Sequence, residues 1–241
     1  MNTHIYSAFD EELKFLANRI AGMGGHAERM VDQAVTALVN ADAGLARKVI
    51  ADDAALDEGQ REIDDKAIVI IAKRQPMADD LREIVGAIRI SADLERVGDL
   101  GKNIAKRVVA VTDSRQPPSL FRGLQSLAEL ALTQLKEVLD IYASRSVDRI
   151  GFVRDRDEQI DAMYTSLFRE LLTYMMEDPR NITACTHLLF CAKNIERIGD
   201  HATNIAETVY YVVTGMQMPA ERPKEDESHK VTFSKPEPAG R

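Results

Sequence analysis

Hydrophobic and polar residues alternate with a helical period along most of the 241-residue chain. Apolar residues recur every three or four positions, which places them on one face of an α-helix. Prolines and small polar residues interrupt this pattern and mark the ends of helices. The glycines of AGMGG, inside the first helical stretch, predict a bend or a close helix contact there. The pattern predicts helices at 8–40, 43–74, 77–112, 120–143, 146–176 and 179–214.

The third and sixth predicted helices carry nearly the same sequence, LERVGDLGKNIAKR at 94–107 and IERIGDHATNIAET at 195–208. A proline-containing turn separates two halves that share the same order of helices. Short connections make consecutive helices antiparallel neighbours. We therefore predict an all-α fold of two tandem three-helix bundles related by an internal repeat, with a disordered C-terminal tail rich in proline and charge. The expected boundaries are 1–113, 119–215 and 216–241.

Composition narrows the classes of function. The chain has 31 Lys and Arg against 39 Asp and Glu, a formal net charge of −8, and nucleic-acid binding needs a basic surface. No signal peptide or apolar run of membrane-spanning length is visible, so we expect a cytoplasmic protein that reaches a membrane only through partners. Cys185 and Cys191 lie on opposite sides of one predicted helix, which favours buried free thiols over a disulfide.

Each repeated segment places two carboxylates one helical turn apart, Glu95 and Asp99 in the first copy and Glu196 and Asp200 in the second. Like charges at this spacing repel by a few tenths of a kcal/mol on an isolated helix. A cation held between them would remove that repulsion. On a helical wheel the acids lie opposite the apolar stripe, so we expect them to face outward from each bundle.

The same stripe extends the candidate set of metal ligands. Asn103 and Asn204 follow one turn later with amide oxygens, and Glu207 continues the second stripe. Gly98 and Gly199, beside the acids, leave room for an ion cluster or for the close approach of another helix. The alternative is that the acids are simply solvated, since duplication alone can preserve a motif without function.

The two copies differ in charge beyond the shared motif. The first stripe carries Lys102 and Lys106, where the second carries Thr203 and Glu207. A lysine repels a cation and can pair with the carboxylates in its place. We therefore expect the second half to bind divalent metal more tightly, and the first half to use its stripe for a protein partner.

Other polar residues near the motifs are weaker candidates. His201 directly follows Asp200 but points about 100° away from it on the wheel, which favours a plain surface histidine over a ligand. No Glu-x-x-His, His-Glu-x-x-His or phosphate-binding P-loop motif occurs, so an enzyme is the weaker interpretation. Acids on the second helix of each half are either further ligands or solvated side chains: Asp57, Asp64, Asp157 and Asp161.

At these motifs the sequence resembles the PhoU family of phosphate-signalling regulators. The resemblance rests on ERVGD at 95–99, ERIGD at 196–200, the NIA after each and MGG at 23–25, and it covers residues 1 to about 215. It implies a non-enzymatic negative regulator of the phosphate-starvation response, an adaptor between a phosphate ABC transporter and a sensor histidine kinase that forms a homodimer.

The resemblance also implies a multinuclear cluster of iron, zinc or another divalent cation. Its ligands would be Glu95 and Asp99 at one site and Glu196 and Asp200 at the other, with Asn103 and Asn204 as weaker candidates. Two alternatives from other classes stay open, a metal-dependent hydrolase or oxidase with a carboxylate site, and a helical scaffold with solvated acidic faces.

Overall fold

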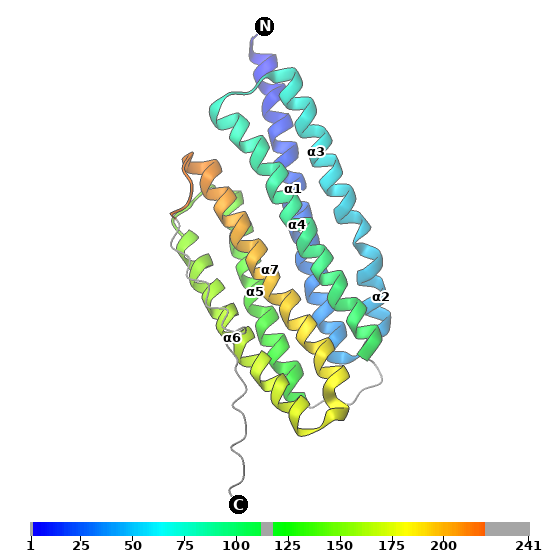
Figure 1. Cartoon of the computed structure of the whole chain (residues 1–241). Helices are drawn as coiled ribbons and strands as arrows, with labels where there is room; N and C mark the ends of the chain where they lie inside the picture. Colours follow the sequence, from blue (N-terminus) through cyan, green and yellow to red (C-terminus); the bar gives the residue numbers. More distant parts are fainter. Residues whose placement is uncertain (1, 112–117, 220–241) are drawn as a thin grey trace, which may run out of the picture.

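A computed structural model describes residues 2–111 and 118–219 and confirms the all-α double bundle (Figure 1). No strand occurs within these two ranges. The turn between the halves and most of the predicted tail lie outside the described residues. The elements are α1 (Asn2–Asn40), α2 (Ala43–Asp52), α3 (Ala54–Arg74), α4 (Ala78–Val111), α5 (Pro118–Ser144), α6 (Ile150–Glu177), the short 3₁₀ helix η1 (Pro179–Asn181) and α7 (Ile182–Thr214).

The second predicted helix of the first half is divided in two, so the prediction of one helix over 43–74 is wrong there. The α-helical hydrogen-bond pattern is interrupted at Asp53, which separates α2 from α3. Its backbone keeps helical angles (φ −56°, ψ −38°), so the chain changes direction little. The Asp53 side chain does not cap α3 but accepts a hydrogen bond from Lys102 on α4. The break therefore delivers a carboxylate to the neighbouring helix.

The two bundles lie side by side, joined along α4 and α7 and along α1 and α5 (Figure 1). α4 and α7 run antiparallel, with Arg107 beside His187 at one end and Gly86 beside Thr208 at the other. Because the repeat spacing is 101 residues (196 − 95), each of these contacts is the other with the two helices exchanged. An approximate two-fold rotation therefore relates the halves.

The apolar stripes form the core, as the helical wheel predicts. On α4 and α7 the apolar residues that lie away from the acids on the wheel are all buried: Ile90, Leu94, Val97, Ile104, Val108, Ile195, Ile198, Ile205 and Val209. Cys185 and Cys191 are also buried and free, as expected. Among the described helices, none combines the length and apolar character needed to cross a bilayer.

The glycine-rich stretch of α1 marks a close helix contact. α1 is continuous through residues 21–25. A Cβ atom at Gly24 would lie 2.7 Å from Leu139 of α5, closer than packed atoms allow. Gly24 therefore allows α1 of the first bundle to pack against α5 of the second, one of the two roles that the sequence left open.

Candidate functional site

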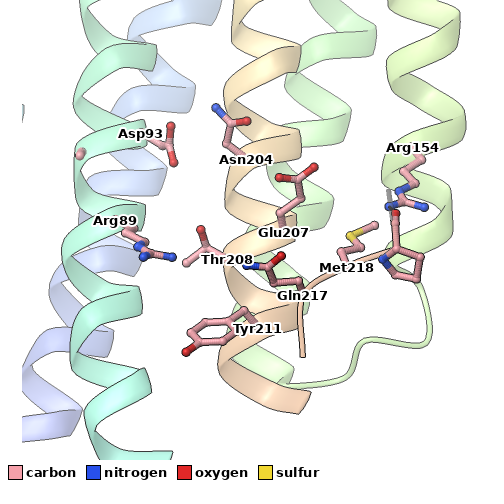
Figure 2. A pocket seen from close by; sticks show the side chains of 11 residues that line it. Arg89, Asp93, Arg154, Asn204, Glu207, Thr208, Tyr211, Gln217 and Met218 are labelled. Atoms are coloured by element: carbon pink, nitrogen blue, oxygen red, sulfur yellow. Dashed lines mark hydrogen bonds between the residues drawn. The ribbon is translucent and has the colours of Figure 1, made fainter. Parts of the chain in front are cut away.

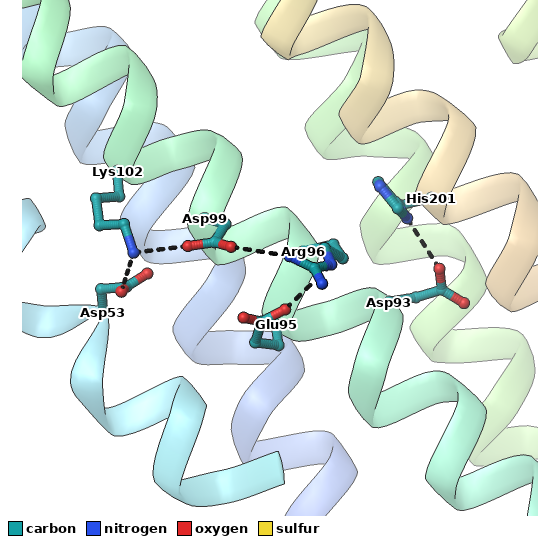
Figure 3. Close-up of polar contacts among 7 residues, drawn as sticks. All are labelled: Asp53, Asp93, Glu95, Arg96, Asp99, Lys102 and His201. Atoms are coloured by element: carbon teal, nitrogen blue, oxygen red, sulfur yellow. Dashed lines mark hydrogen bonds and ion pairs between the residues drawn. The ribbon is translucent and has the colours of Figure 1, made fainter.

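The first acidic motif lies on the side of α4 that faces α2 and α3 (Figure 3). The side chains of Glu95 and Asp99 are 16% and 27% exposed. Arg96 contacts both, with its Nε 3.5 Å from Glu95 Oε2 and its Nη1 3.3 Å from Asp99 Oδ2. The Lys102 ammonium lies 2.6 Å from Asp99 Oδ1 and also bonds to Asp53. Arg96 and Lys102 thus already offset part of the negative charge of this cluster.

Neighbouring charges shift the pKa values of residues in the first motif. Burial and repulsion from Asp99 raise the pKa of Glu95, Arg96 lowers it, and Asp57 and Asp53 raise it further. Burial opposes the charge on Lys102, but hydrogen bonds to its two carboxylate partners outweigh this and raise its pKa. Lys102 therefore pairs with the motif, which is the competition expected from the sequence.

The second acidic motif is more deeply buried. Glu196 is 5% exposed, and its Oε1 accepts a hydrogen bond of 2.8 Å from Lys193. The other oxygen, Oε2, is buried and has no hydrogen-bond partner among the described residues. Burial raises the pKa of Glu196 to about 7; Lys193 lowers it, and Asp200 and Asp161 raise it. Glu196 is thus a carboxyl that changes charge near neutral pH.

The expectation that the acids face outward is wrong for Glu196 and only partly right for Glu95, because a neighbouring helix covers each acidic stripe. A Cβ atom at Gly98 would overlap the side chain of Leu56 on α3. One at Gly199 would lie 3.0 Å from Ile160 on α6. The glycines therefore admit another helix, the second of their two predicted roles. A wheel for a single helix cannot show this, since it gives directions and not neighbours.

The outer candidates lie apart from the carboxylate pairs. Asn103, Asn204 and Glu207 are exposed. Glu207 follows Glu196 by eleven residues, about 16 Å along the helix axis, and lines a groove instead of the acid pair. Lys193 is the contact that sequence reasoning missed. Its position three residues before Glu196, on the same helix face, was the available signal.

Thr203 occupies the position that corresponds to Lys102, and it organises a buried hydrogen-bond network. Its hydroxyl donates to Asp157 Oδ1 (3.0 Å) and accepts from Gln134 Nε2 (3.1 Å). The same amide nitrogen donates to the carbonyl of Val153 (2.9 Å). The second half thus uses a hydroxyl where the first uses an ammonium.

His201 joins the two bundles. Its Nδ1 lies 2.8 Å from Asp93 Oδ1 on α4, and both side chains are largely buried (Figure 3). The prediction of a plain surface histidine is therefore wrong. The pairing of α4 with α7, which the sequence of either helix does not reveal, brings the two residues together.

The carboxylate and amide oxygens of the predicted ligands are of the type that binds hard cations, but they are not arranged as a formed metal site. Within residues 2–111 and 118–219, no three carboxylate, imidazole or thiol groups stand together as a ready cluster. Carboxylate oxygens are nevertheless the usual ligands of such ions, and Glu196 offers a buried oxygen without a partner. The ligand set stays a prediction: Glu95, Asp99, Asn103, Glu196, Asp200, Asn204 and Glu207.

Known proteins resemble this chain over nearly its whole length. A "Phosphate-specific transport system accessory protein PhoU homolog" from Rhizobium meliloti is 72% identical over 225 residues, 93% of this chain and 95% of that protein. The homolog of the same description from Caulobacter vibrioides is 48% identical over 226 residues, 94% and 98% of the two chains.

Solved structures share the architecture. The crystal structure of PhoU from Pseudomonas aeruginosa superposes with a TM-score of 0.80 at 37% identity, covering 86% of this chain and 100% of that one. The phosphate transport system regulatory protein PhoU from Streptococcus pneumoniae also gives 0.80, at 28% identity, with 88% and 99% covered. The PhoU domain family model matches residues 20–108 and 124–209. The chain therefore belongs to the PhoU family.

Proposed function

We propose that this protein is a non-enzymatic accessory regulator of phosphate-specific transport, which represses the phosphate-starvation response when phosphate is plentiful. The observation that carries the proposal is the 72% identity, over almost the full length of both chains, to a protein described as a phosphate-specific transport system accessory protein. The Streptococcus pneumoniae structure at 0.80 TM-score, described as regulatory, supports the same role.

The proposed partners are a phosphate ABC transporter and a sensor histidine kinase, between which a homodimer of this protein acts in the cytoplasm. A net charge of −8 favours protein partners over nucleic acid. The paired acids Glu95 and Asp99 already have Arg96 and Lys102 as partners. Partner contact on these faces therefore falls to exposed residues at their outer ends, such as Asn103.

The metal proposal rests on the buried oxygen of Glu196. An iron or zinc ion in the second half would be held by Glu196 and Asp200, with Asp161 as the nearest further acid, and Lys193 would give up its contact with Glu196. The ion would supply positive charge that offsets the repulsion among these acids. Its role would be structural or regulatory.

The regulatory role is tested with a transcriptional reporter for a phosphate-starvation gene. Deletion of the gene for this protein should switch the reporter on in rich phosphate, and the wild-type gene should switch it off again. The double variant Glu196→Gln/Asp200→Asn should repress less well at equal protein level. Glu170→Gln is the control, because Glu170 is an exposed acid on α6 that belongs neither to the acidic motifs nor to the predicted ligand set. A reporter that stays silent after deletion would contradict the proposal.

The metal proposal has a separate readout. Protein purified without added metal is analysed for iron and zinc, alongside Glu196→Gln/Asp200→Asn and Glu95→Gln/Asp99→Asn. We expect each double variant to lose bound metal, and the second-half variant to lose more. Equal metal content in all three proteins would contradict it.

A further inference from the structure

A groove of about 810 Å³ lies between the two bundles, along the C-terminal half of α7 (Figure 2). α4 forms one wall, and the start of α6 with residues 217–219 forms the other. The volume lies in the range of small-molecule sites, roughly 300–1,000 Å³. The polar residues that matter to its chemistry are Arg89, Arg154, Asn204, Glu207, Thr208 and Tyr211.

The two halves differ at a contact beside this groove. In the first half Arg107 reaches across to α7, where its guanidinium lies 4.5 Å from the centre of the Phe190 ring. The repeat spacing of 101 residues places Thr208 at the position of Arg107 and Arg89 at the position of Phe190. The threonine side chain is shorter than that of arginine, and it packs beside Gly86 on α4. Space between the helices therefore stays open beside Arg89, and both residues line the groove.

Arg89 supplies a positive charge that the fold does not use. It is exposed, and it forms no ion pair with the described residues. Figure 2 shows its guanidinium directed into the groove, towards Thr208 and Gln217. Tyr211 lines the same groove one turn further along α7. By contrast, Arg154 at the far wall donates to the carbonyl of Pro219. At its end of the groove, the Arg89 guanidinium therefore lies close to the hydrogen-bond donors of Thr208 and Gln217.

We propose that this groove binds a small organic phosphate monoester, with the phosphate at the Arg89 end. A guanidinium binds phosphate through paired, charge-assisted hydrogen bonds. The three terminal oxygens of a phosphate monoester use the further donors of Thr208, Tyr211 and Gln217, which a carboxylate, with two oxygens, uses less fully. The site and its ligand do not depend on the proposed role in phosphate regulation.

The rest of the groove indicates the size and polarity of the part of the ligand that carries the phosphate. Its volume far exceeds what an inorganic phosphate ion needs, and Met218 and Pro219 add apolar surface. Glu207 and Asn204 offer oxygens that accept hydrogen bonds from ligand hydroxyls. The charge of Glu207 also disfavours further phosphates. The ligand class is therefore a nucleoside monophosphate or a sugar phosphate.

The test is isothermal titration calorimetry on the full chain in EDTA, which prevents an ion at the acidic motifs from binding phosphate. The probes are AMP, glucose 6-phosphate, ATP, inorganic phosphate and citrate. At least one monoester should bind more tightly than ATP, phosphate and citrate. Arg89→Gln should weaken it at least tenfold. Arg89→Phe/Thr208→Arg, which rebuilds the closed contact of the first half, should abolish binding. Arg122→Gln, an exposed arginine on α5, is the control.

The outcomes separate cleanly. Thermal melting of each variant shows whether it is folded, and Arg89→Gln, at an exposed residue, is expected to melt like the wild type. The proposal is overturned if neither monoester binds the wild type at millimolar concentration, or if Arg89→Gln binds as tightly as Arg122→Gln. Inorganic phosphate or citrate binding as tightly as the monoesters would also overturn it. The starvation reporter stays independent of all these results.

Discussion

The two halves carry the same acidic motif in different electrostatic surroundings. In the first, Lys102 reaches two carboxylates, and its charge is built into the fold. In the second, Thr203 takes that position, and Glu196 is buried with a pKa of about 7. The motif is thus the constant part, and the residues around it decide how its charge is balanced. A duplicated sequence can therefore acquire two chemistries through substitutions at neighbouring positions.

The comparison also revises the reason for expecting tighter metal binding in the second half. That half is not free of lysine, since Lys193 contacts Glu196. The Lys193 side chain is 40% exposed, however, whereas that of Lys102 is 20% exposed and is held between Asp53 and Asp99. Moving the Lys193 ammonium into water, so that a metal ion can bind Glu196, should therefore cost less free energy than moving that of Lys102. The expected order of affinities stays a prediction, now on the grounds of exposure.

The largest expected difference between the halves is in the pH dependence of stability. In metal-free protein the pKa of Glu196 is about 7, against 4.5 for an unperturbed glutamate. The folded state then holds a proton that the unfolded state releases, so stability is complete below pH 4.5 and is lost as pH rises through 7. Glu196→Gln should lack this loss, which amounts to about 3 kcal/mol. Urea denaturation in EDTA at several pH values measures it.

The matched variant in the first half is Glu95→Gln. Its effect should have the same sign, because burial and repulsion from Asp99 also raise the pKa of Glu95. It should be smaller, because Arg96 lowers the pKa of Glu95 and because Glu95 is less buried than Glu196. Parallel pH curves for wild type and Glu196→Gln would show that the buried carboxyl is not the source of the difference.

The next largest effect is expected at Lys102. Lys102→Met leaves Asp53 and Asp99 without their shared cation, and losing one partner of a mostly buried ion pair should cost about 2 kcal/mol at pH 7. Lys106→Met is the control, since Lys106 is exposed and should cost less than about 0.5 kcal/mol. Added Zn²⁺ should raise the melting temperature of Lys102→Met more than that of wild type. Equal shifts would show that the ammonium and the ion do not compete.

Local features of this fold were predictable from the sequence, because they depend on residues close together in the chain. The 3.6-residue period located the helices and the buried stripes, including Val97 and Ile198. It also placed Glu95 with Asp99, and Glu196 with Asp200, on one face. The repeat correctly indicated two similar bundles.

Contacts between distant segments were not predictable in this way. The Asp53–Lys102 pair crosses from the α2–α3 break to α4, and the Asp93–His201 pair crosses between bundles. Both depend on which helices become neighbours and at what height. The burial of Glu196 and the groove beside Thr208 also depend on which helices become neighbours and at what height.

A smaller difference is expected at the paired glycines of the motifs. In Gly98→Ala the new methyl overlaps Leu56, which is fully buried and has little room to move, so overpacking should exceed the gain of about 1 kcal/mol in helix propensity. In Gly199→Ala the nearest atoms lie at 3.0 Å, and the two terms should nearly cancel. We expect a net loss of about 1 kcal/mol for the first and about zero for the second. Equal losses in urea denaturation would contradict the packing difference.

The smallest expected effect is at the contact between Arg107 and Phe190, which joins α4 and α7 at one end. The equivalent positions at the other end, Thr208 and Arg89, line the groove. Arg107→Gln removes the guanidinium from the face of Phe190 and should cost about 0.5–1 kcal/mol. Arg89→Gln, at the position equivalent to Phe190, should leave the free energy of unfolding unchanged, because Arg89 forms no ion pair with the described residues. Urea denaturation of both variants in EDTA makes the comparison. If Arg89→Gln proved as costly as Arg107→Gln, Arg89 would be a structural residue, and the groove would lose its free cation.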